Sequence, residues 1–158
     1  MKEHDLSTRE AKPPTVPPRW FVRTAWVVHR AIFNVTRGRK GLWLAKPNKW
    51  GAMRVTTIGR KTGKERSVIL GYFEDGPNLV TMAMNGWAEG DPAWWLNLRA
   101  NPDATVILKN GTRAVRASTA TGAERDRLWA RWQEMGDDTE GYSNLRATET
   151  PVVVLAPH

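Results

Sequence analysis

The chain has 158 residues, no cysteine and a formal net charge of +8. A chain of this length is expected to form one domain that buries a proper core without disulfides. The lack of cysteine excludes disulfides, thiolate nucleophiles and cysteine-ligated metals. The histidines His4, His29 and His158 are scattered, and two of them lie near the termini. No metal site is therefore expected.

Charged and apolar residues are spread unevenly along the chain. No apolar run approaches the roughly 20 residues that cross a bilayer, and the polar, acid-containing N-terminus is unlike a secretory signal. The cytoplasm is thus the expected compartment. Residues 1–61 carry 14 Lys and Arg against 3 acids, whereas residues 62–158 carry 10 against 13. Because the basic excess is confined to the N-terminal third, the whole domain is not predicted to be a nucleic-acid binder.

The N-terminal segments precede the main domain. Residues 1–18 are polar and proline-rich, which predicts a flexible arm. Across residues 19–41, apolar positions recur every three or four residues, and a basic cluster with two glycines follows, which predicts a basic amphipathic helix. This helix either docks on the domain with its basic face in solvent or rests on an anionic membrane surface, where each cation contributes about 1 kcal/mol. Nucleic acid is a third alternative.

Residues 42–158 predict a single α+β domain. Leu42 to Trp50 is a connector or a short edge strand, and Asn110-Gly111 is a strong hairpin signal. A helix is expected after Asp91 as N-cap and Pro92, ending at Asn101-Pro102, and another at Gly122–Met135. Strands are expected at 53–57, 67–73, 79–84, 104–109, 112–118 and 151–156. Six short-linked, mostly antiparallel strands with three peripheral helices, the N-terminal one included, predict a small barrel.

The turn from Gly59 to Arg66 holds four cations within seven residues. One interpretation is an ordinary connector that exposes charge to solvent. The functional interpretation places Arg60, Lys61 and Arg66 around phosphate or carboxylate groups, with the Thr62 hydroxyl beside them. Each well-formed charge-assisted hydrogen bond contributes roughly 1.5–3 kcal/mol, so the turn is a candidate site for an anionic cofactor.

Beyond this turn, the sequence offers candidate binding residues but no candidate general acid or base. Trp94 and Trp95 are adjacent on a helix and point about 100° apart, so we expect one in the core and the other toward a pocket. Asn97 follows on nearly the same face as Trp94. Neither histidine nor a clearly placed acid accompanies them. This favours chemistry carried by a cofactor that the protein binds and orients.

Three runs along residues 42–156 together resemble a known family: TTIGRKTGKERSVILGYF, NGW with DPAWWLNLRANPDATV, and TPVVVLAP. They are similar to the deazaflavin-dependent nitroreductases and quinone reductases, split β-barrel (FMN-binding-like) enzymes that use reduced coenzyme F-420. The N-terminal helix is also similar to that of members which associate with the inner face of the cell membrane.

The resemblance implies a hydride transfer from the deazaflavin to a small-molecule acceptor, namely a quinone, a nitroaromatic compound or an activated alkene. It implies that Arg60, Lys61 and Arg66 hold the cofactor's phosphate and acidic tail, and that Trp94 borders the substrate. The full set of implied cofactor-binding residues is Arg60, Lys61, Thr62, Arg66, Ser67, Val68, Ile69, Leu70, Met84, Asn85, Gly86, Ala93, Trp94 and Asn97.

The sequence departs from the family pattern at a few positions. Known members have Lys at the position of Asn85 and Pro at that of Ile69, and those that reduce nitro compounds carry several tyrosines before the last strand. Here only Tyr142 is kept, as a second candidate for the substrate pocket. The alternatives are a split barrel that binds FMN or carries a ligand without turnover, and a basic module that binds membrane or nucleic acid.

Overall fold

The fold is given by a computed structural model, which describes residues 24, 41–86, 88–135, 144 and 146–158. In these ranges, six strands and two helices follow one another in chain order. They are β1 (Gly51–Ile58), β2 (Glu65–Asp75), β3 (Asn78–Met82), α2 (Ala93–Ala100), β4 (Asp103–Leu108), β5 (Gly111–Thr119), α3 (Gly122–Glu134) and β6 (Val152–Pro157).

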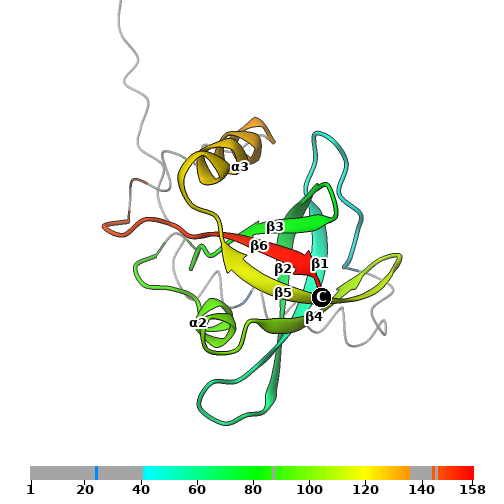
Figure 1. The fold of residues 1–158 in the computed structure, drawn as a ribbon, viewed down its shortest axis with the longest axis vertical. Helices are drawn as coiled ribbons and strands as arrows, with labels where there is room; N and C mark the ends of the chain where they lie inside the picture. The colour runs from blue at the N-terminus through cyan, green and yellow to red at the C-terminus, as the bar shows by residue number, and fades with distance from the viewer. Residues whose placement is uncertain (1–23, 25–40, 87, 136–143, 145) are drawn as a thin grey trace, which may run out of the picture.

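The six strands form a closed barrel in the order β1-β2-β3-β6-β5-β4, and β1 pairs with β4 to close it (Figure 1). Every neighbouring pair is antiparallel. Three of these pairs, β1–β2, β2–β3 and β4–β5, are joined by links too short for a parallel crossover, as the sequence predicts. The Asn110-Gly111 hairpin joins β4 to β5 as expected, with Leu108 opposite Gly111.

The barrel has an interior core and a second core under α3. Strand β6 shows the division, because Val153 and Leu155 pack inside the barrel while Val152 and Val154 pack with Leu128 and Trp132 of α3. Both faces of β6 are therefore buried, which explains its unbroken apolar run. The prediction of a buried last strand is confirmed.

The two helices cover different parts of the barrel. Helix α2 packs against β1 and β2, whereas α3 packs against β6. In Figure 1 the β1–β2 loop projects at the bottom of the view, on the same side of the barrel as α2 and far from α3. The loop and α2 thus bring two chain segments that are about forty residues apart to one end of the molecule.

Several expectations need correction or fall outside the described residues. Asp91 does not cap α2: the N-cap is Pro92, with φ −66° and ψ 150°, and no side chain caps the helix. Strand β3 ends at Met82, so Met84 lies beyond it. Two of the three expected helices fall within the described residues, and both are present there. The third, within 19–41, lies outside the described residues except for Thr24 and Gly41, as does the arm at 1–18.

Candidate functional site

The β1–β2 loop is a tight hairpin closed by its own backbone. The amide of Gly59 donates to the carbonyl of Lys64 at 2.8 Å, and the amide of Gly63 donates to the carbonyl of Gly59 at 2.8 Å. Gly63 has φ 66°, in the left-handed region where side chains are disfavoured. The hairpin therefore holds its four cations on a short, defined turn.

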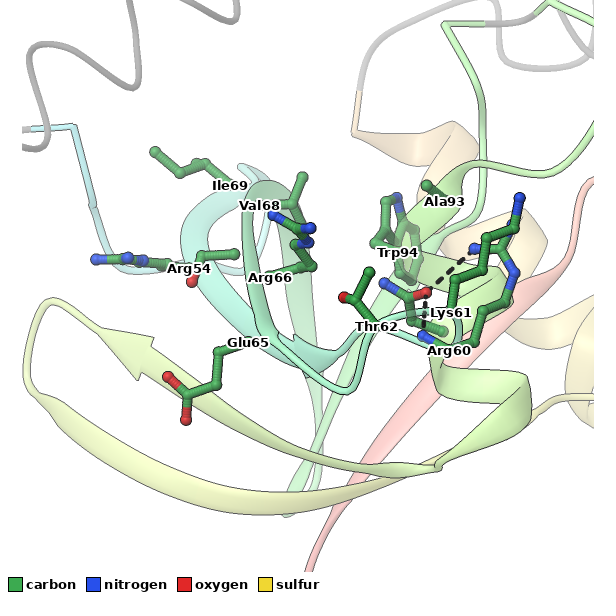
Figure 2. A pocket seen from close by; sticks show the side chains of 13 residues that line it. Arg54, Arg60, Lys61, Thr62, Glu65, Arg66, Val68, Ile69, Ala93 and Trp94 are labelled. Atoms are coloured by element: carbon green, nitrogen blue, oxygen red, sulfur yellow. Dashed lines mark hydrogen bonds between the residues drawn. The ribbon is translucent and has the colours of Figure 1, made fainter.

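A cavity of about 670 Å³ lies between this loop, strands β1 and β2, and helix α2. Arg54 and Ile69 lie at one end in Figure 2, Arg60, Lys61 and Trp94 lie at the other, and Arg66 and Val68 lie between them. The complete lining is Arg54, Gly59, Arg60, Lys61, Thr62, Glu65, Arg66, Ser67, Val68, Ile69, Ala93, Trp94 and Asn97. Such a volume lies within the range of cofactor and substrate pockets.

The charged side chains of the lining are cationic except for that of Glu65. Arg60, Lys61 and Arg66 are exposed, and within the described part of the chain none of them forms an ion pair with an acid. The carboxylate of Glu65, the one acidic side chain of the lining, points away from Arg66 in Figure 2. Guanidinium and ammonium groups in this arrangement suit a phosphate or several carboxylates.

The buried Asn97 amide fastens the basic loop to α2. Its Oδ1 accepts hydrogen bonds from both the backbone amide and the Nη1 of Arg60, each at 3.2 Å, drawn as dashed lines in Figure 2. Its Nδ2 donates to Thr57 Oγ1 at 3.3 Å, and that hydroxyl donates to the carbonyl of Arg66 at 3.3 Å. Since protein groups engage both ends of the amide, Asn97 orients the loop from within the pocket wall.

The rest of the pocket lining includes apolar and aromatic side chains. Trp94 lines the cavity together with Ala93, Val68 and Ile69. Its neighbour Trp95 belongs to the interior core, and the two indole rings are 6.3 Å apart at an interplanar angle of 62°. Trp94 is buried in the same core cluster as Trp95, so it packs in the core and also lines the cavity. The prediction that one of the two faces a pocket is confirmed, but the expected division of the pair between pocket and core is wrong. A flat aromatic ligand can thus contact apolar side chains while its anionic groups meet the cations.

Ten of the fourteen residues expected at a cofactor site line this cavity, from Arg60 to Ile69 and at Ala93, Trp94 and Asn97. The others lie elsewhere. Leu70 faces the barrel interior and Met84 packs in the core under α3. Asn85 donates to the carbonyl of Glu89, and neither it nor Gly86 lines the cavity. Tyr142 lies outside the described residues.

Sequence reasoning missed three lining residues, Arg54, Gly59 and Glu65. Arg54 is opposite Ile69 in the β1–β2 ladder, so the two side chains share one face. The alternation of apolar Met53 and Val55 with charged Arg54 was the available signal in the sequence. It indicates which face of β1 a side chain takes, but the strand pairing decides which residues it meets there.

The chain matches known proteins over most of its length. The profile of the F-420H(2)-dependent quinone reductase family matches residues 27–157. An F-420H(2)-dependent quinone reductase of Mycobacterium tuberculosis is 31% identical over 146 residues, which cover 87% of this chain and 95% of that protein. Among solved structures, one described as an F-420-H2-dependent reductase has a TM-score of 0.61 at 26% identity, covering 73% of this chain and 99% of the other.

A further solved structure, described as a domain-swapped dimer, has a TM-score of 0.62 at 26% identity and covers 84% of this chain and 98% of its own. The family match, the closed antiparallel barrel and the pocket with its cations all support the same assignment. The family consists of oxidoreductases whose cofactor is reduced coenzyme F-420. The chain therefore belongs to the F-420H(2)-dependent quinone reductase family and is an F-420-dependent reductase.

Proposed function

We propose that this enzyme reduces a quinone with reduced coenzyme F-420, and that the pocket between the β1–β2 loop and α2 is the site of the reaction. The observation that carries the proposal is the continuity of one cavity from the cations Arg60 and Lys61 to the indole of Trp94. The family profile and the curated mycobacterial relative, which is named as a quinone reductase, support it.

The residues present fit the cofactor. Its phosphate and carboxylates need donors that no internal acid neutralises, which Arg60, Lys61 and Arg66 provide in the described part of the chain. Its planar ring system needs an apolar surface, which Val68 and Trp94 provide. When bound, reduced F-420 supplies a hydride to the acceptor.

The protein's own contribution is binding, orientation and exclusion of water. Cations at the loop neutralise the tail, and the Asn97 amide holds the Arg60 backbone and guanidinium in place. Ala93, Trp94 and Ile69 remove water from the apolar part of the pocket. The overall reaction transfers two electrons and two protons, so that quinone becomes hydroquinone and reduced F-420 becomes oxidised F-420.

The acceptor is tested by turnover. Reduced F-420 is mixed with the enzyme and, in separate reactions, with a soluble naphthoquinone, a nitroaromatic compound or an activated alkene, and the absorbance of oxidised F-420 is followed. We expect the quinone to have the highest kcat/KM. Equal or faster reduction of the nitro compound or the alkene would contradict the assignment of quinone as the preferred acceptor, while the cofactor assignment would stand.

We further propose that the enzyme contacts an anionic membrane surface through residues 19–41, which lie outside the described residues apart from Thr24 and Gly41. The support is in the sequence, where cations of an amphipathic pattern are followed by Arg37, Arg39 and Lys40. Among the residues that the structure describes, no helix has the length and apolar character that a membrane span needs.

A further inference from the structure

A buried arginine lies outside the pocket but next to the segment that leads into its α2 wall. The side chain of Arg146 has 0% exposure. Its Nη1 donates to Thr150 Oγ1 at 2.9 Å and to the carbonyl of Ala83 at 3.3 Å, and its Nη2 donates to the carbonyl of Gly90 at 3.1 Å. Among the described residues, Arg146 pairs with the acid Asp91, whose Oδ1 is 3.7 Å from Nη2.

Apart from Thr150, these partners lie at the two ends of one loop. Ala83 directly follows β3, and Gly90 and Asp91 directly precede the first turn of α2. One planar guanidinium thus bridges the exit of a barrel strand and the entry of the helix. A buried charge is costly unless hydrogen bonds and an opposite charge compensate it, so this arrangement is stable only while both ends of the loop stay in place.

Further contacts hold the segment 146–151 on the same loop. The amide of Ala147 donates to the carboxylate of Glu89, and the amide of Ala83 donates to the carbonyl of Pro151 at 2.9 Å. Asp91 also pairs with Arg99 of α2, at 3.5 Å. The chain just before β6 therefore supports the entry of α2, although Arg146 and Gly90 are 56 residues apart in sequence.

Helix α2 carries Ala93, Trp94 and Asn97, its three contributions to the pocket lining. Its first backbone hydrogen bonds run from the amides of Trp95 and Leu96 to the carbonyl of Pro92, next to Asp91. A shift at Gly90 and Asp91 would hence move the Trp94 wall and the Asn97 amide that orients Arg60. Small displacements of positioning groups have large effects on binding and rate.

We propose that Arg146 is a positioning residue for the F-420 pocket, which sets the placement of α2 by bridging both ends of the loop between β3 and α2. Its effect on cofactor binding rests on the proposed function of the pocket, whereas its effect on α2 does not. This role requires a guanidinium, whose N–H donors lie in one plane and point in several directions. Two carbonyls, a hydroxyl and a carboxylate surround the side chain of Arg146. A lysine ammonium, as a point donor, does not span both ends.

The test uses Arg146→Met, Arg146→Lys and a control, Arg125→Met. Arg125 is a matched control because it also contacts the segment before β6, with Nη2 donating to the carbonyl of Thr150 at 3.1 Å and Nε 2.8 Å from Glu149 Oε1. It extends from α3, however, and does not reach the loop before α2. Amide hydrogen exchange of ligand-free protein is measured for peptides of α2 and of the barrel strands, and oxidised F-420 is titrated separately.

We expect both Arg146 variants to speed exchange in residues 93–100 while β1, β5 and β6 keep their protection, and to weaken F-420 binding about tenfold, or about 1.4 kcal/mol. The Arg125 control should leave α2 exchange and F-420 affinity unchanged. The proposal would be overturned if α2 of Arg146→Met exchanged at the wild-type rate. It would also be overturned if Arg146→Lys behaved like the wild type, or if α2 and the barrel strands lost protection equally.

If Arg146→Met does not fold, Arg146→Lys carries the same test. Failure of wild-type protein to bind F-420 would refute the function of the pocket. The exchange result on α2 would still decide whether Arg146 positions the helix.

Discussion

Asn97 Oδ1 accepts two hydrogen bonds from Arg60, one from its backbone amide and one from its guanidinium, both at 3.2 Å. Two chain segments that are 37 residues apart are thereby joined at the rim of the pocket. Because the Asn97 amide is also bonded to Thr57, which is fully buried, the basic loop, β1 and α2 form one connected unit.

This relationship predicts the effect of Asn97→Ala. Thr57 Oγ1 and the Arg60 amide each lose a partner, so we expect the free energy of unfolding to fall by about 1–3 kcal/mol and F-420 binding to weaken. Urea unfolding and calorimetric titration measure the two effects. Asn101→Ala is the control, because Asn101 caps the same helix but its Oδ1 accepts from the Asp103 amide and, among the described residues, not from the basic loop. Equal losses of affinity in both variants would contradict the assigned role.

The cations of the basic loop should determine cofactor affinity. We expect Arg60→Ala combined with Lys61→Ala to weaken F-420 binding at least about tenfold, which is about 1.4 kcal/mol. The control is Lys109→Ala with Arg113→Ala, which removes the same charge from the β4–β5 hairpin outside the pocket. Calorimetric titration of both double variants distinguishes direct contact with F-420 from an effect of net charge. A similar loss of affinity in both would contradict the assignment of the basic loop as the cofactor site.

The adjacent tryptophans should respond differently to the same substitution. Trp94→Leu removes an aromatic surface from the pocket lining, and we expect F-420 to bind more weakly by about 0.5–1.5 kcal/mol. Because Trp94 also belongs to the interior core, the free energy of unfolding should fall as well. Trp95→Leu alters the interior core and should lower the free energy of unfolding without changing affinity in the folded fraction. Thermal melts and titrations separate the two effects. Weaker binding in Trp95→Leu alone would reverse the roles given to the pair.

An ion pair between β2 and α3 should make stability depend on pH. Arg127 donates to both carboxylate oxygens of Asp75, at 2.8 and 2.9 Å, and this hydrogen bonding holds the pKa of Asp75 below its ordinary value. A lowered folded-state pKa gives stability that is present above the unfolded pKa, about 3.9. That stability is lost as pH falls through the lower folded-state pKa.

Asp75→Asn should therefore have a lower melting temperature than wild type at pH 7, and the difference should shrink as the pH falls below about 4. Because the pair is partly solvated, we expect a small effect. Thermal melts across this pH range provide the measurement. A difference that stays constant with pH would show that the ionised pair does not cause it.

The basic segment at 19–41 should bind anionic vesicles reversibly. We expect the full-length protein to float with vesicles that contain phosphatidylserine at low salt and to be released at high salt, because screening weakens surface charge. Replacement of Arg37, Arg39 and Lys40 by glutamine should reduce flotation. A protein that does not float at any salt concentration would favour a helix that docks on the barrel.

Much of the barrel could be predicted from local sequence. Alternation along β1, the apolar run of β6 and the Asn110-Gly111 turn each depend on residues close in the chain. The basic loop could be predicted for the same reason, since its cations and glycines are contiguous. Local signals therefore located the strands and one wall of the pocket.

The remaining features depend on contacts between distant segments. Nothing near Arg146 indicates that its guanidinium is buried against Ala83 and Gly90, because arginine usually lies at the surface. Likewise, the sequence suggested a cap at Asp91, but that carboxylate lies near Arg99 and Arg146. Asn97 was predicted to border the cofactor, and only its bonds to Arg60 and Thr57 show that it orients the loop.

The most direct test of the account is a titration of the wild-type protein with oxidised F-420 and, in parallel, with FMN, followed by tryptophan fluorescence. The chain has nine tryptophans, and Trp94 lines the pocket. We predict saturable quenching by F-420 at micromolar concentrations, weaker binding of FMN, and a reduced quenching amplitude in Trp94→Leu. Tighter binding of FMN, or no binding of F-420, would contradict the claim that this pocket holds the deazaflavin.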